Sequence, residues 1–483
     1  MHIDLDQYDS TAPLTPEVCV VGCGAAGITV ARRLLELGHA VTLLESGGID
    51  YEPATASLNA GKNIGQEYYD LEDARLRFFG GTTAIWGGRV SELDPIDLET
   101  RHWVPHSGWP ISWQDLASYY PRARRIFGIP DRSVSLQELR RGGVPIPGLR
   151  PAALDVGTWD FDRRFNRFQF TACQDLIAHP RCTILTHATC TELRLHPGGQ
   201  QVESMIVRSM NGRTLTIRPQ VVVLAGGGLE NPRLLLASRS VAPNGIGNDH
   251  DQVGRYFMEH PRARGGRIIG AGVWTLLNAF GRPHRIGGRE VAALIKPSVE
   301  VQQQLGILNT SLTITARQPA GAAQAWGMRA YTRIKHDMAP TRAGRALWMV
   351  TKKAAAWVQH HTDPLRPWVL HKLGLREISL LIRAEQAPNP ASRVMLTNQV
   401  DALGMPRLAL DWHLTGQDVA SVAGLVDVLG EELRRLRLGS VERAGWLDGS
   451  AGWRTDPLIS SHPIGGYHHM GTTRMSGSPR NGV

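Results

Sequence analysis

The sequence contains no apolar run of the roughly 20 residues that a membrane-spanning helix needs. Its first ten residues, MHIDLDQYDS, are acidic and polar, so we expect neither a signal peptide nor a twin-arginine leader. Five scattered cysteines without a C-x-x-C pair argue against a disulfide framework or a zinc site and favour a reducing compartment. No nucleic-acid-binding module is recognisable. These absences predict a globular, cytoplasmic protein that uses no metal and binds no nucleic acid.

Positive charge is unevenly distributed along a chain whose formal net charge is +9. Nine Lys or Arg residues but two Asp lie between Arg329 and Lys372, and tryptophans are interspersed among them. We expect one helix face there to carry Trp348, Val350, Ala354, Trp357 and Val358. A basic amphipathic helix with tryptophans suits an anionic membrane, so one hypothesis is a peripheral membrane contact through 329–372. The alternative is a helical insertion whose tryptophans, Trp326 and Trp368 included, face the domain.

The stretch Glu17–Gly48 organises the rest of the chain. A short apolar run, Glu17–Val21, predicts a buried strand, and Gly22, Gly24 and Gly27 follow at G-x-G-x-x-G spacing. Helical periodicity then covers Ile28–Leu37, and a second strand, Ala40–Leu44, ends at Glu45. Such a unit holds a dinucleotide: the glycines admit the pyrophosphate at a helix N-terminus, and Glu45 is placed to accept from ribose hydroxyls. The unit leaves FAD and NAD both open.

Two further glycine-rich segments point to the same ligand. Four glycines, two threonines and an indole in RLRFFGGTTAIWGGRV predict a loop lying close to a flat ligand, with Thr82 and Thr83 available to phosphate. After Thr183 come short alternating runs with an Asn211-Gly212 hairpin signal, which predict a three-stranded antiparallel meander. Gln220–Leu224 then reads as a second buried parallel strand. It leads into a glycine turn and a helix over Glu230–Ser238.

The remaining chain predicts a different domain. Runs such as GRIIGA, EVAALIKP, GILNTSLTITA, EISLLIRAEQ, RVMLT and RLALDW are candidate strands of a mostly antiparallel sheet. Thr415 can cap a helix of about twenty residues, whose apolar stripe is core. Earlier in the chain, ISWQDLASYYPRARRIF predicts one helix starting at Ser112.

Six segments of the chain, taken in order, can be compared with known families. They are the glycine unit ending in Glu45, GGTTAIWGGR (Gly80–Arg89), AGGGLENPRLLLAS (Ala225–Ser238), VGRYFMEHP (Val253–Pro261), APNPASRV (Ala387–Val394) and YHHMGTTRM (Tyr467–Met475). Together they resemble the glucose–methanol–choline (GMC) oxidoreductase family of FAD enzymes. The resemblance selects FAD over NAD.

The resemblance implies an α/β fold: a Rossmann-like FAD-binding domain (parallel sheet plus β-meander) with a second α+β substrate domain built on a mostly antiparallel sheet. We expect the FAD-binding domain at 1–263, with 441–483 returning to it, and the substrate domain at 264–440, with a basic helical insertion at about 321–372. The cofactor-binding residues implied are Gly22, Gly24, Gly27, Glu45, Gly80, Gly81, Thr82, Thr83, Trp86, Gly87, Thr189, Ala225, Gly226 and Asn231. Ile85 stands where some members carry a histidine bound covalently to the flavin, so FAD is expected to be non-covalent.

The family reaction oxidises a CH–OH carbon of an alcohol or sugar, with a base taking the hydroxyl proton as hydride leaves for flavin N5. By resemblance His468 is that base, with His469 secondary, while His260 is either near the flavin or structural. Relatives continue into a tail that closes the FAD site and supplies a second catalytic residue, which is expected beyond Val483. The electron acceptor, whether quinone, protein or oxygen, is left open, with a preference for a dehydrogenase. The alternatives are a truncated, non-catalytic flavin-binding or membrane-associated protein and an NAD-dependent dehydrogenase.

Overall fold

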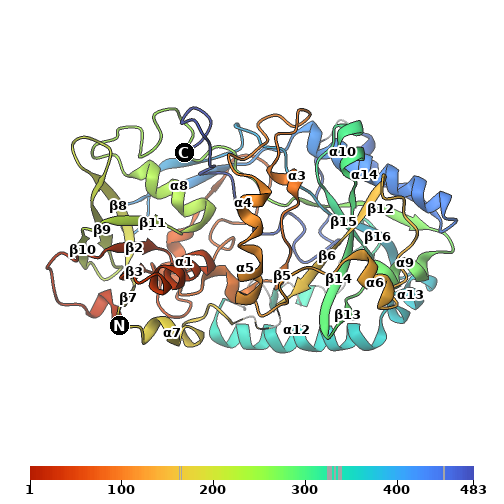
Figure 1. Ribbon diagram of the computed structural model, residues 1–483, viewed down its shortest axis with the longest axis horizontal. Helices are drawn as coiled ribbons and strands as arrows, with labels where there is room; N and C mark the ends of the chain where they lie inside the picture. The colour runs from red at the N-terminus through yellow and green to blue at the C-terminus, as the bar shows by residue number, and fades with distance from the viewer. Residues whose placement is uncertain (163, 165, 324–328, 331–332, 335–339, 450–451) are drawn as a thin grey trace.

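The computed structural model describes residues 1–483 except 163, 165, 324–328, 331–332, 335–339 and 450–451. Trp326 and part of the expected basic insertion lie outside the described residues. Figure 1 shows a parallel sheet at one end of the molecule and a large antiparallel sheet at the other. The fold class expected from the sequence is confirmed.

The first sheet is parallel throughout and has the strand order β1-β7-β3-β2-β11. Its strands are β1 (His2–Asp4), β7 (Cys182–Thr186), β3 (Val41–Leu44), β2 (Val18–Val21) and β11 (Val221–Leu224). Helix α1 (Ala25–Glu36) follows β2, and it begins directly after Gly24, three residues earlier than the periodicity indicated. The sheet therefore places the carboxyl ends of β2, β3 and β11 along one edge, where a dinucleotide is expected.

The expected meander lies between two strands of this sheet. It consists of β8 (Thr189–Leu195), β9 (Val202–Arg208) and β10 (Thr214–Ile217), in the order β10-β9-β8. Gly212 turns the β9–β10 hairpin with a left-handed φ of +84°, which confirms the Asn-Gly signal. The chain then enters β11 and α8 (Gly227–Ala237), a helix that starts three residues before its expected position.

The large sheet is antiparallel and has the order β19-β12-β16-β15-β14-β6-β5, with β13 beside β14. Its strands are β5 (Arg89–Val90), β6 (Leu154–Phe161), β12 (Arg262–Ile269), β13 (His284–Ile286), β14 (Arg289–Pro297), β15 (Ser311–Arg317), β16 (Glu377–Arg383) and β19 (Ser440–Arg443). Strand β12 runs through the expected boundary at 263/264, and β5 and β6 join from the earlier part of the chain. The division into two domains stays a prediction.

One face of the large sheet is covered and the other is open. On β14, Val291, Ala293 and Ile295 are buried against α9 (Val273–Phe280) and α14 (Gly416–Arg435). The alternate residues point to the opposite face, because side chains alternate along a strand. Thr415 caps α14 through a reciprocal pair of bonds with Asp418, as its sequence indicated. The open face is therefore free to line a site.

The helix α12 (Arg342–Thr362) runs along the lower side of the molecule in Figure 1, from beside α7 to below β13 and β14. Arg345 pairs with Asp50, two residues after the dinucleotide unit, and Gln359 donates to the carbonyl of Gly281 at the end of α9. The expectation that Trp348 and Trp357 share a face is wrong: Trp348 is 1% exposed and Trp357 62%. The two tryptophans lie nine residues, roughly two and a half turns, apart and so point in opposite directions.

The remaining elements connect these layers. A small sheet joins β17 (Arg393–Val400), β18 (Pro406–Asp411) and β4 (Gly61–Asn63). The other α-helices are α2 (Pro53–Ala56), α3 (Pro95–Leu98), α4 (Trp113–Ala117), α5 (Tyr120–Ile126), α6 (Leu136–Arg141), α7 (Gln174–Ile177), α10 (Val299–Leu305) and α13 (Leu365–Lys372). The single helix expected from Ser112 is wrong, because Pro121 opens a second helix, α5, after α4 ends. Among the described residues, none of these helices has the length and apolar content to cross a bilayer.

Candidate active site

The glycine segments found in the sequence converge on one place. A Cβ added at Gly22 would lie 2.6 Å from the carbonyl oxygen of Ala225, so the turn after β2 packs against the turn after β11. A Cβ at Gly81 would lie 3.6 Å from Cα of Gly24, which brings the second glycine loop to the first. A Cβ at Gly228 would lie 2.6 Å from the carbonyl oxygen of His469. Four segments far apart in sequence therefore form one site.

The first turn leaves room for a ligand at a specific glycine. Gly27 is needed for packing, since its Cβ would meet the carbonyl oxygen of Gly22 at 1.9 Å. Gly24 has an ordinary φ of −77°, and a Cβ there would meet nothing within 4 Å. Neither strain nor internal packing requires this glycine, and it stands at the N-terminus of α1, where backbone N–H groups attract phosphate. The residues present therefore fit a dinucleotide.

Glu45 lies where β3 ends, but its carboxylate is buried and already engaged. It accepts from the backbone N–H of Cys23 at 3.2 Å and of Gly47 at 3.0 Å. Burial raises the pKa of Glu45, and the two amides oppose that shift. The acid thus ties the end of β3 to the glycine turn, and contact with a ribose stays a prediction.

The loop after Phe79 forms the short 3₁₀ helix Gly81–Ile85, which starts from a left-handed Gly80. Gly80 donates its N–H to the carbonyl of Cys23 at 2.8 Å, which holds the loop against the first turn. The Thr83 hydroxyl donates to the Gly80 carbonyl, while the Thr82 hydroxyl accepts from an amide and keeps its own proton. Thr82 is therefore the threonine still able to donate to a phosphate.

The end of this loop contacts α12. Ile85, Trp86 and Gly87 line the main cavity, and Ile85 presents only hydrocarbon there. The Lys352 ammonium donates to the carbonyls of Trp86 at 3.2 Å and Gly87 at 3.4 Å, and it lies 4.6 Å from the centre of the Trp348 ring. Helix α12 thereby fixes one wall of the cavity.

The other expected cofactor residues lie around the same edge of the parallel sheet. Thr189 shares a 2.6 Å hydrogen bond with Ser46, next to Glu45. The Asn231 side chain accepts from the Gly226 N–H at 2.8 Å and donates to the Leu224 carbonyl at 3.4 Å. Asn231 therefore shapes the turn after β11, and its contact with a cofactor stays a prediction.

A cavity of about 2190 Å³ separates the glycine loops from the open face of the large sheet. Its lining includes residues 82–83 and 85–89, alternate residues of β14 and β16, part of β15, the inner face of α12 and His468. Pockets for one small ligand have volumes of roughly 300–1,000 Å³. This cavity is therefore large enough for a cofactor's ring system and a substrate together.

Glu259 organises the base end of the cavity. Its buried carboxylate accepts from the Tyr68 hydroxyl at 2.6 Å and from the N–H groups of His260 at 2.7 Å, Gly466 at 3.0 Å and His468 at 3.0 Å. Burial alone would raise its pKa, but the neighbouring histidine rings and these donors outweigh burial and lower the pKa to about 2. A single ionised carboxylate thus fixes the backbone of the histidine loop.

His468 projects from that loop onto the cavity wall. Tyr467 before it has a left-handed φ of +61°, which is uncommon for a residue with a side chain, and its ring stacks on Tyr69. The His468 ring lies edge to face with His260, 5.2 Å between centroids. Desolvation by the cavity wall and then the nearby His260 lower the pKa of His468 to about 4. His468 is therefore a neutral imidazole at neutral pH.

His469 points the other way, into an aromatic cluster with Tyr68 and Phe257. Its Nε2 lies 2.9 Å from the Tyr68 oxygen. Because the single proton of that hydroxyl points to Glu259, His469 donates the bond. His469 does not line the cavity, and burial lowers its pKa to about 4. The structure brings one of the two adjacent histidines to the cavity and uses the other for packing.

Sequence reasoning missed Glu259 and Tyr68. Glu259 lies inside the segment VGRYFMEHP, where it is the only carboxylate, and that was the one available signal. Tyr68 lies in a stretch expected to be loop, and nothing in its neighbourhood indicates a role. Both act through partners far away in sequence.

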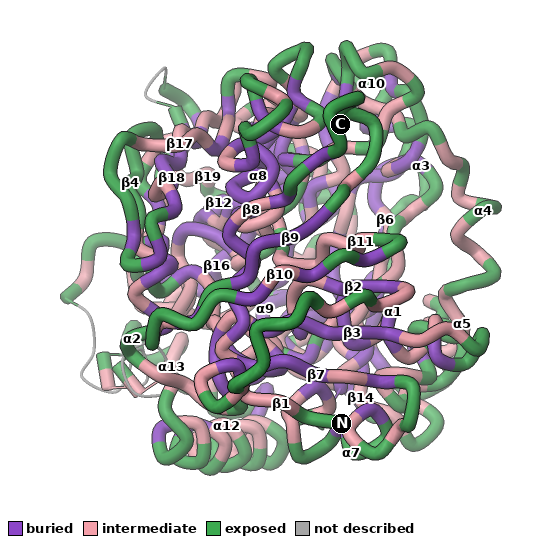
Figure 2. The backbone as a smooth tube through the Cα atoms, turned by 90° about the vertical axis from the view of Figure 1, so that its left-hand side faces the viewer, coloured by how far each residue is buried: buried purple, intermediate pink, exposed green. Residues whose placement is uncertain are grey.

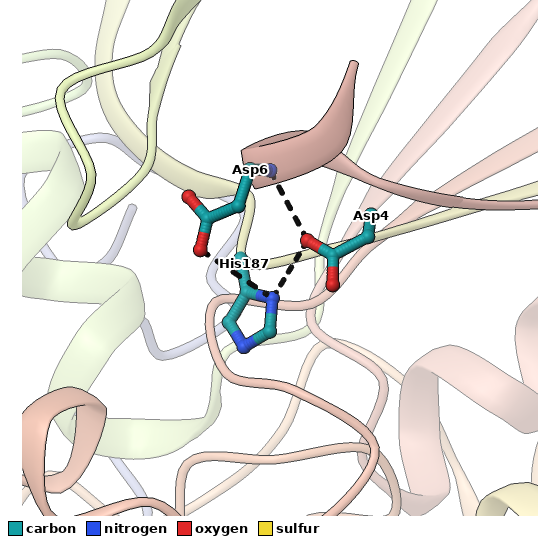
Figure 3. Close-up of side chains that lie close together, drawn as sticks. All are labelled: Asp4, Asp6 and His187. Carbon is teal, nitrogen blue, oxygen red and sulfur yellow. Dashed lines mark hydrogen bonds and ion pairs between the residues drawn. The ribbon is translucent and has the colours of Figure 1, made fainter.

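One cluster of potential metal ligands occurs among the described residues, formed by Asp4, Asp6 and His187. Figure 3 shows Nδ1 of His187 facing the Asp4 carboxylate, 2.8 Å away. Its Nε2 lies 2.9 Å from Glu52, so both ring nitrogens donate to carboxylates. Burial lowers the pKa of His187, and these carboxylates outweigh that effect and raise it. The cluster is an ion-pair network that ties β1 to the turn after β7.

Comparison with known proteins agrees with this geometry. The model of the FAD dependent oxidoreductase family (DAO) matches residues 17–296, more than half of the chain. The chain is 24% identical to 2-methyl-1,2-propanediol dehydrogenase of Mycolicibacterium austroafricanum, over 97% of this chain and 87% of that protein. It is 25% identical to 6'''-hydroxyparomomycin C oxidase of Streptomyces lividus, over 51% of this chain and 54% of that protein.

Among solved structures, pyridoxine 4-oxidase from Mesorbium loti has a TM-score of 0.54 at 17% identity, covering 96% of this chain and 90% of its own. A formate oxidase has a TM-score of 0.51 at 16% identity, and the match covers 98% of this chain and 91% of the oxidase. These likenesses support the fold. The family match makes FAD the dinucleotide in place of the NAD alternative. The chain thus belongs to the FAD-dependent oxidoreductase family, and the GMC resemblance drawn from its sequence is confirmed.

Proposed function

We propose that this enzyme oxidises the CH–OH group of a small-molecule alcohol or sugar, with His468 as the base. The observation that carries the proposal is the placement of a neutral imidazole on the wall of a large cavity, opposite the glycine loops. The names of two relatives, a propanediol dehydrogenase and a hydroxyparomomycin oxidase, support an alcohol or sugar as substrate.

FAD, when bound, supplies an acceptor for the hydride that leaves the carbon bearing the hydroxyl. The chain's own task is to remove the hydroxyl proton as that carbon becomes a carbonyl. His468 accepts the proton on an imidazole nitrogen, while Glu259 holds the His468 backbone in place. The negative charge of Glu259 also favours the imidazolium that results. One hydride and one proton leave the substrate, so charge and atoms balance.

The test is anaerobic mixing of the flavin-loaded protein with a panel of alcohols and sugars, followed in the visible spectrum. We expect at least one CH–OH compound to bleach the visible absorbance of the oxidised flavin. Reoxidation by a quinone faster than by oxygen would support the dehydrogenase preference. Bound FAD that no alcohol bleaches would instead support the alternative of a non-catalytic flavin-binding protein.

Ile85 supports a dissociable cofactor, because its side chain offers no nucleophile at the cavity wall. Acid precipitation is therefore expected to release all the flavin into the supernatant. Flavin retained in the pellet would contradict a non-covalent site.

The outer face of α12 and α13 supports a peripheral membrane contact as a second proposal. We define this outer face by its exposed apolar residues, which are Leu347, Val350, Trp357, Leu365, Val369 and Leu373. Exposed basic side chains, Arg342, Lys353 and Lys372 among them, flank it. Figure 2 shows exposed positions along the outer side of α12. Anionic headgroups complement such a surface, and a quinone acceptor would be reached from there.

A further inference from the structure

We infer that the substrate carries an oxyanion, a carboxylate or phosphate, which binds between Arg262 and Arg383 on the open face of the large sheet. The inference rests on the proposed function and deepens it by naming a class of substrate. Both arginines line the same cavity as His468.

The two guanidinium groups lie side by side. Arg262 on β12 and Arg383 on β16 are register partners of adjacent antiparallel strands, so their side chains share one face. Like charges placed directly opposite each other destabilise a sheet. An arginine keeps its charge under all ordinary conditions, so neither side chain escapes this repulsion by losing a proton.

Neither arginine forms an ion pair with a carboxylate among the described residues, although the charge of Glu259 partly opposes the burial that lowers the pKa of Arg262. Arg262 donates weakly to Ser460 at 3.4 Å and to the His462 carbonyl at 3.3 Å, and Arg383 donates to Thr313 at 3.0 Å. The Nε atom of each is buried and has no hydrogen-bond partner. By contrast, Arg264 on the same strand is paired with Asp456. Arg262 and Arg383 therefore lack the ion-pair partner that their neighbour Arg264 has.

Nearby acids are committed elsewhere. In the cavity lining, Asp94 pairs with Lys296, and Glu385 pairs with Arg101. The guanidinium of Arg383 instead lies over the Trp159 ring, 4.7 Å from its centre. A cation–π contact offsets part of the desolvation cost but brings no negative charge. A bound oxyanion would supply that charge and the missing acceptors.

The arginine pair lies close to the proposed base. His260, whose ring contacts His468, lies two residues before Arg262, and Arg262 is itself one of the charges that lower the pKa of His468. A substrate that reaches both His468 and the arginines therefore carries a hydroxyl and an oxyanion on one molecule. Hydroxy acids such as 4-hydroxybutyrate, uronic acids and sugar phosphates combine these two groups.

The first test measures binding of an anion that the enzyme cannot oxidise as an alcohol. Butyrate and its neutral isostere butyramide are titrated into the flavin-loaded protein and followed by the flavin spectrum and by calorimetry. Butyrate is expected to bind at least about 10-fold more tightly, since a buried charge-assisted bond commonly accounts for that factor. The preference is expected to vanish in Arg383→Met and to persist in Arg267→Met, whose guanidinium lies on β12 outside the cavity. Equal binding of the two probes to the wild type would overturn the inference.

A second readout guards against a misfolded variant. Because Arg383 has no ion-pair partner and lies opposite Arg262, ligand-free Arg383→Met is expected to melt at or above the wild-type temperature. A large loss of stability would show a structural arginine and count against the site. Butyrate and butyl phosphate, compared on the wild type, show which oxyanion is preferred.

Turnover then distinguishes this inference from the proposed function. We expect 4-hydroxybutyrate to bleach the flavin at lower concentration than 1,4-butanediol, and choline to be poorest of the three. Butyrate selectivity without oxidation of any alcohol would keep the anion site and refute the proposed oxidation. Oxidation of neutral alcohols without any butyrate selectivity would keep the oxidation and refute the anion site.

Discussion

His468 combines a fixed backbone with a ring that faces the cavity. Its N–H is bound by Glu259, whereas its imidazole contacts the ring of His260 and the open space. Because the two functions belong to different atoms, side-chain substitutions can remove the base without releasing the loop. This separation makes the proposed role directly testable.

His468→Ala is expected to slow flavin reduction by substrate roughly 10²–10⁴-fold, the usual contribution of a general base, with FAD still bound. Stopped-flow reduction under anaerobic conditions measures the change. His413→Ala serves as the control, because His413 is a partly exposed histidine paired with Asp411. An unchanged rate in His468→Ala would remove the residue from the mechanism.

The pH profile offers an independent check on the same residue. The pKa of His468 is lowered to about 4, so the base is deprotonated above that pH and lost as the pH falls through it. Flavin reduction in the wild type should therefore be level near neutrality and decline toward pH 4. Glu259, with its pKa near 2, stays ionised over this range. A decline that persists in His468→Ala would assign the titration to another group.

His187→Gln tests the ion-pair network at the N-terminal strand. The folded pKa of His187 is raised above its ordinary value of about 6.5. Its stabilisation is therefore fully present below about pH 6.5 and is lost as the pH rises through the folded pKa. We expect wild type to exceed the variant by about 1 kcal/mol in unfolding free energy at pH 6, with the difference vanishing at high pH. Urea unfolding across pH measures it, and a difference that grows with pH would contradict the assignment.

At the scale of elements, the β2–α1 turn uses its glycines for two different purposes. Gly27→Ala places a methyl group 1.9 Å from a carbonyl oxygen, so we expect a loss of at least about 3 kcal/mol or no soluble protein. Gly24→Ala places its methyl group in open space, so the fold should persist while FAD binding fails. Circular dichroism and flavin content distinguish the two variants. Gly24→Ala protein that retains its full complement of FAD would contradict the assigned pyrophosphate position.

Local patterns were sufficient to predict whole elements. The β2–α1–β3 unit, the meander with its Asn211-Gly212 turn and the capped helix α14 all follow from neighbouring residues. Two predictions of this kind were wrong. Pro121 divides the helix expected from Ser112, and Trp348 and Trp357 lie on opposite faces of α12. The first error reflects the preference of proline for the start of a helix, and the second reflects a spacing of about two and a half helical turns.

The site itself was only partly predictable. His468 was found from its motif, but Glu259, Tyr68 and the pairing of Arg262 with Arg383 were not. The state of each depends on partners more than a hundred residues away, such as the Tyr68–Glu259 bond. A sequence shows that a carboxylate or guanidinium exists. Whether that group has a hydrogen-bond or ion-pair partner depends on the contacts of the folded protein.

At the scale of the whole molecule, the outer face of α12 and α13 predicts a surface property. Wild-type protein should co-sediment with phosphatidylglycerol vesicles, much less with phosphatidylcholine vesicles, and release from both at high salt. The double substitution Val350→Ser with Trp357→Ser should abolish sedimentation. Leu305→Ser, which changes an exposed leucine on α10, should leave it intact. Equal sedimentation of the double variant and wild type would refute the membrane contact.

The bond between Tyr68 and His469 joins residues 401 positions apart. A ribosome making this chain therefore completes the dinucleotide turn long before the histidine loop emerges, since synthesis proceeds from the N-terminus at about 5–20 residues per second. For tens of seconds the nascent protein has a place for its cofactor and no base beside it. The proposed base therefore joins the cofactor's place only after the chain through Tyr467 and His468 has been made.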